Sequence, residues 1–388
     1  MKLFIKHTLI FSILFVLMAC NSKSKHNHSE ISVASTGESL FALSEFPEKM
    51  EERVISINPN EATTWNLSQI AESITPISLS SYKDFSKNKM QYVYLTDDYI
   101  FVVGATSIAQ LDRSGKHIRT IYCDDYINDI TGDAAQKEIY ICTKSKVICY
   151  DYALKVKKTI HTQFRTNSIF YHQNKVWIGS FELKGDRDTT RQFSVGTITH
   201  RISSWDRINE TEIFLPFELN QDYERAAIPQ RIVFSVYNDQ LVFSNGMNST
   251  LYVIQNDNVF PFIRYEIEPS GDLKYILHPY AEQRFTGKNL WITYYIANRS
   301  TTDITSPIAF NSENYIYFED TETGQAYNIH DTLYDDMYHT GDLNIFRIYK
   351  DYFIVFRAAF DLQKSTNLKI PTDSQAFFIG KFKTPTTK

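Results

Sequence analysis

From residue 53 onward, hydrophobic and polar positions alternate with a period of about two residues. Runs rich in Ile, Val, Phe, Tyr and Thr are separated by short polar stretches of Asn, Asp, Gly and Ser. This pattern is typical of strands joined by turns, and it predicts an all-β sandwich, barrel or propeller. One segment departs from the pattern. Residues 64–74 (TWNLSQIAESI) favour a short turn of helix ahead of a strand over residues 74–79.

Six segments share one internal order of strand, turn, strand, loop, strand, turn and strand. In the clearest, residues 92–121, a strand ending at Leu111-Asp112 precedes the turn Arg113-Ser114-Gly115-Lys116. The others cover residues 127–160, 168–217, 231–267, 285–336 and 344–382. Four antiparallel strands make a propeller blade, so we predict a six-bladed β-propeller of four-stranded antiparallel blades, with five or seven blades as alternatives. Residues 53–58 and 74–79 are predicted to complete the last blade and close the ring.

The first 20 residues, MKLFIKHTLIFSILFVLMAC, are typical of a secretion signal that ends at a cysteine. A positive start precedes an apolar run from Leu9 to Ala19, which is short for a membrane-spanning helix, since such a helix needs about 20 apolar residues. Leu17-Met18-Ala19-Cys20 resembles the bacterial lipobox, whose cysteine carries lipid. We therefore predict a signal peptide over residues 1–19 and lipidation at Cys20. The alternative is an ordinary signal peptide with an incidental cysteine.

Residues 20–52 are polar and Ser-rich, and they predict a flexible tether between the lipid and a propeller domain over residues 53–388. His26 and His28 lie in this tether, where two histidines make a poor metal site and a solvated linker is the simpler interpretation. Asn21 follows the lipid cysteine without an acidic run. This resembles Gram-negative lipoproteins sorted to the outer membrane and facing the periplasm, with surface export as the alternative.

The charge balance excludes some partners. The precursor has 40 basic and 45 acidic side chains, and loss of the signal peptide removes two lysines. A mildly acidic body without a basic stripe argues against nucleic acid and against anionic lipid as partners. The 27 Phe, 25 Tyr and 4 Trp favour strands over helices.

Three cysteines follow Cys20, and an odd number is not a disulfide framework. Residues 138–144 and 146–152 predict a hairpin that turns near Ser145, a register in which Cys142 faces Cys149 across the ladder. This register predicts a possible disulfide between Cys142 and Cys149. The alternative is that both are small buried hydrophobic residues.

The chain resembles the six-bladed β-propeller lipoproteins of Bacteroides-type bacteria, related in fold to NHL and TolB-like propellers. Three stretches carry the resemblance: the lipobox, residues 65–79 (WNLSQIAESITPISL), and the turn over residues 111–116 (LDRSGK). The resemblance implies the six-bladed fold rather than an activity, because most of the family has no known function. Where many members carry a Gly/Pro-rich loop of GxGPGEY type after the first blade, residues 122–130 here contain neither Gly nor Pro.

Catalytic signatures are absent from the sequence, which lacks H-E-x-x-H, G-x-S-x-G, P-loop and paired CxxC motifs. The acidic pairs Asp124-Asp125 and Asp335-Asp336 fit Ca²⁺ ligands or, without further spaced ligands, solvated turns. No two histidines of the body have a ligand-like local spacing, so neither a metal nor another cofactor is predicted.

Partner contacts are predicted around the widened third repeat. Arg187 and Arg191 would decorate a long hairpin that projects from the disc, either as a docking arm or as a solvated insertion. Trp177 and Trp291 lie in strand contexts that bury them, whereas Trp205 is predicted to be exposed and to contact a partner.

We therefore expect a cell-envelope lipoprotein whose propeller binds or scaffolds an envelope protein or a glycan, without catalysis. One alternative is an NHL-like lyase or hydrolase with a metal in the central channel. Another is a TolB-like periplasmic adaptor that bridges envelope complexes.

Overall fold

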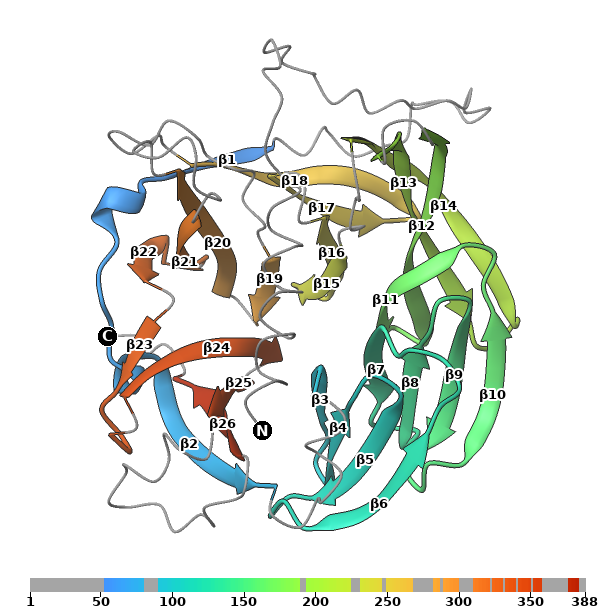
Figure 1. The fold of residues 1–388 in the computed structure, drawn as a ribbon, viewed down its shortest axis with the longest axis horizontal. Helices are drawn as coiled ribbons and strands as arrows, with labels where there is room; N and C mark the ends of the chain where they lie inside the picture. The colour runs from blue at the N-terminus through green and yellow to red at the C-terminus, as the bar shows by residue number, and fades with distance from the viewer. Residues whose placement is uncertain are drawn as a thin grey trace, which may run out of the picture.

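The computed structural model describes residues 52–79, 90–188, 193–224, 231–245, 249–267, 282–286, 289–299, 310–321, 323–330, 332–339, 341–349, 352–357 and 376–383. Small antiparallel sheets form a ring, and the chain is a six-bladed β-propeller, as the repeats predicted (Figure 1). Among the described residues, no helix is long and apolar enough to cross a membrane. The signal peptide, Cys20 and nearly all of the predicted tether lie outside the described residues.

Blades 1 to 5 follow one another along the chain, each running from an inner strand to an outer one. Blade 1 contains β3 (Tyr92–Leu95), β4 (Tyr99–Val103), β5 (Ser107–Asp112) and β6 (His117–Tyr122). Blade 2 contains β7 (Asp129–Asp133), β8 (Glu138–Cys142), β9 (Lys146–Asp151) and β10 (Val156–His161). Blade 3 contains β11 (Arg165–His172), β12 (Lys175–Asp188), β13 (Phe193–Asp206) and β14 (Thr211–Glu224).

The remaining blades carry the strands of the second half of the chain. Blade 4 contains β15 (Ile232–Tyr237), β16 (Gln240–Asn245), β17 (Thr250–Gln255) and β18 (Asn258–Ile267). Blade 5 contains β19 (Glu282–Thr286), β20 (Asn289–Arg299), β21 (Phe310–Asp320) and β22 (Gln325–His330). Blade 6 contains β24 (Gly341–Tyr349), β25 (Tyr352–Arg357) and β26 (Ala376–Phe382), and β2 (Ala71–Ser78) from the N-terminal region adds its outer strand. A further strand, β23 (Thr332–Asp335), pairs with the first residues of β24 at the rim, where Tyr334 bridges to Asn66.

The hydrophobic core is divided among the junctions between neighbouring blades. Ile139 and Ile141 of blade 2, for example, pack against Phe101 and Val103 of blade 1. Corresponding clusters join blades 2–3, 3–4, 4–5, 5–6 and 6–1. A middle strand is therefore buried on both faces, and β4 reads as an unbroken apolar run. The period of two is clear in an outer strand that faces solvent on one side, as over residues 211–220 of β14.

An aspartate shared by several repeats has a structural role at the end of the third strand of a blade. The carboxylate of Asp112 accepts hydrogen bonds from the backbone N–H of Ser114 (2.9 Å) and Lys116 (3.0 Å). Asp151 and Asp206 cap the corresponding turns of blades 2 and 3 in the same way. The repeated Asp step is thus explained by turn capping, since Asp readily bonds to nearby backbone N–H groups.

The N-terminal segment is a belt over residues 52–79 along the outer edges of blades 4, 5 and 6. Strand β1 (Arg53–Ile57) pairs in parallel with β18 of blade 4, and Thr63 bridges to Ile329 of blade 5. After a 3-10 turn, η2 (Pro59–Glu61), and the short helix α2 (Leu67–Ile70), β2 pairs with β26 and closes the ring. The short helix and the closing role of residues 74–79 are confirmed.

The prediction that residues 53–58 complete the last blade is wrong, because β1 adds a fifth strand to blade 4 instead (Figure 1). Its inward side chains explain this position. Ile55 and Ile57 are buried in the junction between blades 4 and 5, against residues such as Ile263 and Tyr294. Strand β1 therefore covers the junction between blades 4 and 5, and the ring is closed elsewhere, in blade 6.

Candidate functional site

The antiparallel strands define two faces of the disc. We call the face that carries the connections into the inner strands the loop face, and the opposite one the turn face. Turn-face hairpins such as Asn238-Asp239 and Asn256-Asp257 are tight, with positive φ at both residues. Several connections on the loop face are longer and lie outside the described residues, including 225–230, 268–281 and 358–375. The connection from β6 to β7, residues 123–128, is described throughout.

This β6–β7 connection crosses the loop face from the outer strand of blade 1 to the inner strand of blade 2. Its Cys123 N–H donates to the carbonyl of Thr106 at 2.8 Å. Its Ile127 N–H donates to the carbonyl of Ala105 at 2.7 Å. These bonds fix both ends of the connection on the β4–β5 turn. The backbone of this connection, which contains neither Gly nor Pro, is thus held by hydrogen bonds at both ends.

Side chains alternate between outward and inward along this connection. Tyr122 is 63 % exposed, Tyr126 is 54 % exposed, and Asp124 between them is exposed as well. We call these three residues the tyrosine–aspartate ridge. The Tyr126 hydroxyl accepts a hydrogen bond from the side-chain amide of Gln91, just ahead of the inner strand of blade 1. The ridge therefore reaches from the rim toward the central channel.

The residues between those of the ridge face their own protein. The Asp125 carboxylate forms an ion pair with Lys146 at 2.8 Å. The Cys123 thiol is half-buried, 3.7 Å from the hydroxyl of Tyr150, and burial raises its pKa. The acidic pair Asp124-Asp125 is thus divided, because one carboxylate has an internal partner and the other faces solvent.

Asp129 and Arg231 join inner strands at the channel end of this face. The buried Asp129 carboxylate accepts the N–H of Ile130 at 2.8 Å and the N–H of Ile169, from blade 3, at 3.0 Å. It also forms an ion pair with Arg231, which precedes the inner strand of blade 4. The Arg231 guanidinium lies over the ring of Tyr92 of blade 1, 5.0 Å from its centroid. One ionic cluster therefore connects the inner ends of four blades.

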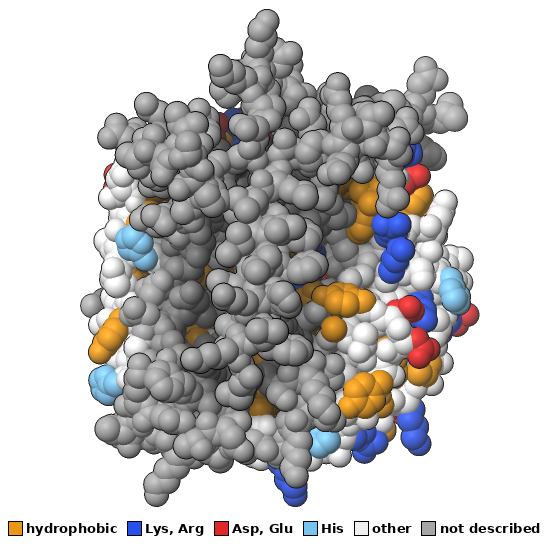
Figure 2. Space-filling model, viewed as in Figure 1, with side chains coloured by type: hydrophobic (Ala, Val, Ile, Leu, Met, Phe, Trp, Pro, Cys, Tyr) orange, Lys and Arg blue, Asp and Glu red, His pale blue; other side chains and the backbone are white. Residues whose placement is uncertain are grey.

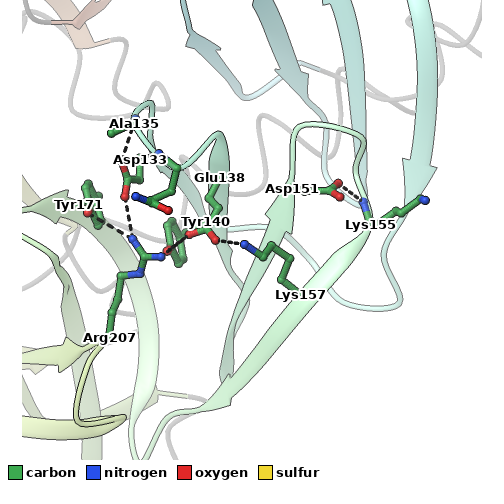
Figure 3. Close-up of polar contacts among 10 residues, drawn as sticks. Asp133, Ala135, Glu138, Tyr140, Asp151, Lys155, Lys157, Tyr171 and Arg207 are labelled. Atoms are coloured by element: carbon green, nitrogen blue, oxygen red, sulfur yellow. Dashed lines mark hydrogen bonds and ion pairs between the residues drawn. The ribbon is translucent and has the colours of Figure 1, made fainter.

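A second ionic cluster lies on the turn face, between blades 2 and 3 (Figure 3). Arg207, in the β13–β14 turn, reaches Asp133 at 2.7 Å and Glu138 at 2.9 Å in blade 2. Its guanidinium also lies over the ring of Tyr171, 5.9 Å from the centroid. Lys157 of β10 forms an ion pair with the other side of Glu138. Like the cluster of Asp129 and Arg231, this cluster joins neighbouring blades.

The protonation of this cluster follows from its contacts. Burial alone would raise the pKa of Glu138, but the bonds from Lys157 and Tyr140 and the charge of Arg207 hold that pKa below its usual value. Tyr140 donates its hydroxyl proton to Glu138 at 2.6 Å, and burial together with this bond raises its pKa. Glu138 is therefore ionised and Tyr140 neutral at pH 7. Such a cluster stabilises a junction and lacks a group poised to exchange protons near neutrality.

The cysteine register differs from the predicted one. Cys142 pairs with Val147 and Cys149 pairs with Tyr140, so the two cysteines are diagonal rather than opposite, and both are free thiols. Diagonal residues lie about 7–8 Å apart, which exceeds the usual span of a disulfide. The turn is formed by Lys144 and Ser145, earlier in the chain than the predicted register requires, since the Thr143 N–H bonds to the Lys146 carbonyl at 2.9 Å. Burial raises the pKa of Cys149 to about 11, and both thiols pack in the junction between blades 2 and 3.

The predicted exposure of Trp205, in the third repeat, is wrong. Trp205 is 5 % exposed and packs between blades 2 and 3, with the Lys158 ammonium 4.7 Å from its ring centroid. The prediction took Trp205 to be exposed, but Trp205 lies within β13 and the turn begins only at Arg207. Trp177 and Trp291 are buried as predicted.

The long hairpin of the third repeat is confirmed, because β12 and β13 pair without interruption over their whole length. Arg187 pairs with Ser194 in this ladder, and Arg191 lies outside the described residues. The role of this hairpin as a docking arm stays a prediction.

The other acidic pair is structural rather than a solvated turn. Asp335 is buried and accepts the N–H groups of Met337 (3.1 Å) and Tyr338 (2.9 Å). Asp336 accepts the N–H of Ser68 at 2.9 Å and so holds α2 against the hairpin of blade 6. Among the described residues, no group of three or more His, Cys, Asp and Glu is placed to hold a metal ion.

Sequence reasoning singled out Asp124 but missed Tyr122, Tyr126, Asp129 and Arg231. The two tyrosines carry a signal in the sequence, since they flank a polar stretch in YCDDY. Asp129 and Arg231 carry none, because only closure of the ring brings them together. On the face in Figure 2, hydrophobic side chains over blades 1 to 3 lie among basic and acidic ones.

No family model and no curated protein matches this chain. Among solved structures, a candidate exported protein of Bacteroides fragilis is similar, with a TM-score of 0.58 and 12 % identity over 85 % of this chain and 100 % of that one. BamB from Moraxella catarrhalis matches at a TM-score of 0.41 and 11 % identity, over 81 % of this chain and 100 % of that chain. Hydrazine synthase of Kuenenia stuttgartiensis matches at 0.43 and 13 %, over 68 % and 72 %. The first similarity agrees with the propeller architecture, and identities this low bear on fold alone.

Proposed function

We propose that this chain is an outer-membrane lipoprotein, anchored through Cys20 and facing the periplasm, whose propeller binds or scaffolds a protein or glycan partner without catalysis. The observation that carries the binding role is the tyrosine–aspartate ridge, which presents two exposed aromatic rings on a connection with a fixed backbone. Aromatic side chains are enriched in protein interfaces, and they also stack on sugar rings.

The position at which the chain enters the propeller supports an anchor that leaves the ridge accessible to a partner. Strand β1 lies on the outer edge of blade 4, so the preceding tether would hold the disc by its rim. Residues 20–52 as a random coil would span about 30 Å, enough to let the disc turn its loop face toward a neighbour. The ridge, on blades 1 and 2, lies away from this point of attachment.

Metabolic labelling with a palmitate analogue tests the anchor. The wild-type chain should incorporate the label and sediment with outer membranes, whereas Cys20→Ala should do neither. Equal incorporation by Cys20→Ala would refute lipidation at this residue.

Co-purification tests the binding role. The full chain, crosslinked in native membranes, should retain a partner that is lost when Tyr122 and Tyr126 are both replaced by Ala. Cys142→Ser, a buried change, would control for general destabilisation. Capture of no protein and no glycan by the wild-type chain would refute the proposal.

A further inference from the structure

We propose that the tyrosine–aspartate ridge binds a cationic side chain, Arg or Lys, that a protein partner presents to the loop face. This inference rests on the proposed binding function and narrows it to one class of partner. It starts from the charge at the centre of the ridge. Asp125 forms its ion pair with Lys146, whereas Asp124, exposed beside it, has no ion pair among the residues that the structure describes.

The two tyrosines add a second attraction for a cation. The face of an aromatic ring attracts an ammonium or guanidinium group placed over it. Tyr122 and Tyr126 flank Asp124 in the sequence, and all three side chains are exposed on the same connection. A cation that pairs with Asp124 is therefore bound on a surface that also presents aromatic rings.

The protein uses the same combination internally in two places. Arg231 lies over the ring of Tyr92 while it forms an ion pair with Asp129. Arg207 likewise combines the ring of Tyr171 with the carboxylate of Asp133 (Figure 3). In both, a tyrosine and an aspartate bind one arginine, and the ridge presents the same two residue types on the surface.

Pre-organisation favours this use of the ridge. The connection is held at Cys123 and Ile127, and Tyr126 is further positioned by Gln91. Binding to such a surface orders few residues, so less of the interaction free energy is lost. A glycan would stack on the same rings, but a neutral sugar does not compensate the charge of Asp124.

Saturation-transfer NMR on the full chain in detergent micelles tests the proposal. The probe is the peptide acetyl-Gly-Arg-Gly-amide, and the matched probe replaces arginine by citrulline, which has nearly the same shape and no charge. The arginine peptide should bind and the citrulline peptide should not. Asp124→Asn should weaken arginine binding by about tenfold, as expected for loss of one charge-assisted bond. Asp97→Asn, which removes an exposed charge from the turn face, should leave binding unchanged.

The outcomes separate this inference from the proposed function. Equal binding of both peptides, or an equal effect of Asp124→Asn and Asp97→Asn, overturns the cation site. A neutral oligosaccharide that binds through the tyrosines and is indifferent to Asp124→Asn overturns it in favour of a glycan. If Asp124→Asn still captures the membrane partner at the wild-type level, the cation site fails while the proposed binding function stands. If the wild-type chain captures nothing, the proposed function itself fails.

Discussion

The Arg231 guanidinium forms an ion pair with the buried Asp129 carboxylate, which links the entrance of blade 4 to the start of blade 2. Blade 3 lies between them and contributes the N–H of Ile169 to the same carboxylate at 3.0 Å. Three consecutive blades are therefore joined at their inner ends by one acidic side chain. The pair is too far apart in sequence to be read from any local pattern.

Replacing Arg231 should weaken the ring. Arg231→Ala removes the ion-pair partner of the buried Asp129 carboxylate, and we expect a loss of about 1–3 kcal/mol in the free energy of unfolding. Urea unfolding followed by circular dichroism measures this loss as a lower midpoint. Lys144→Ala, at an exposed turn of the same face, is the control and should change the midpoint little. Equal midpoints for both variants would contradict a stabilising role for the ion pair.

Much of the fold could be predicted because each repeat carries its own local code. The Asp of Leu111-Asp112 predicts a capped turn, and apolar runs such as residues 99–103 predict strands buried on both faces. The closing strand could also be predicted, because residues 74–79 continue the period of two. These features depend on interactions between near neighbours in the chain.

The predictions from sequence that were wrong concern interactions between distant residues or the register of a hairpin. Strand β1 joined blade 4 because Ile55 and Ile57 fit a junction that exists only after the ring has closed. A shift in the hairpin turn moved Cys142 from Cys149 to Val147, because register is set by the turn. Trp205 lies next to a polar turn in sequence, yet its ring packs against blade 2. Tertiary packing decided the first and the third, and the local geometry of the turn decided the second.

The belt offers a matched pair of substitutions within one strand. Ile57 is 1 % exposed in the junction between blades 4 and 5, whereas Val54 on the same strand is 48 % exposed. Ile57→Ala should cost about 2–4 kcal/mol through lost burial and a cavity, while Val54→Ala should cost less than about 0.5 kcal/mol. Urea unfolding measures both. Similar small effects would mean that β1 contributes little to the junction.

The Glu138 cluster should make stability depend on pH. Because the pKa of Glu138 is lower in the folded protein than its usual 4.5, its ionised form stabilises the fold above about pH 4.5, and this contribution is lost as pH falls through the folded-state pKa. Glu138→Gln should therefore cost about 1–3 kcal/mol at pH 7, and the difference from wild type should shrink below pH 4.5. Urea titrations from pH 7 downward measure the difference, with the exposed Glu61→Gln as control. A difference that grows on acidification would contradict the lowered pKa.

The cysteines should behave as thiols. The mass of the unfolded protein should be the same with and without reductant, and Cys123, Cys142 and Cys149 should all be alkylated by iodoacetamide in denaturant. In the folded protein Cys123 should react first, because it is half-buried while the other two are buried. Peptide mapping after timed alkylation measures the order. A mass change on reduction, mapped to Cys142 and Cys149, would restore the disulfide.

Two glycines distinguish backbone strain from close packing. Gly115 and Gly324 both have positive φ, at 89° and 70°. A Cβ on Gly115 would lie 2.8 Å from Ile77 Cγ2 and from the carbonyl oxygen of Ser78, whereas one on Gly324 would meet nothing within 4 Å. Gly324→Ala should therefore cost only the left-handed backbone penalty, about 1–2 kcal/mol.

Gly115→Ala should cost that penalty and the contact with β2, about 2–4 kcal/mol in all. Because β2 closes the ring, the loss should also appear as faster hydrogen exchange in residues 71–78, which Gly324→Ala should leave unchanged. Urea unfolding and hydrogen exchange on both variants measure the two effects. Equal costs without a change in exchange at β2 would mean that the blade 1 turn does not support the closure.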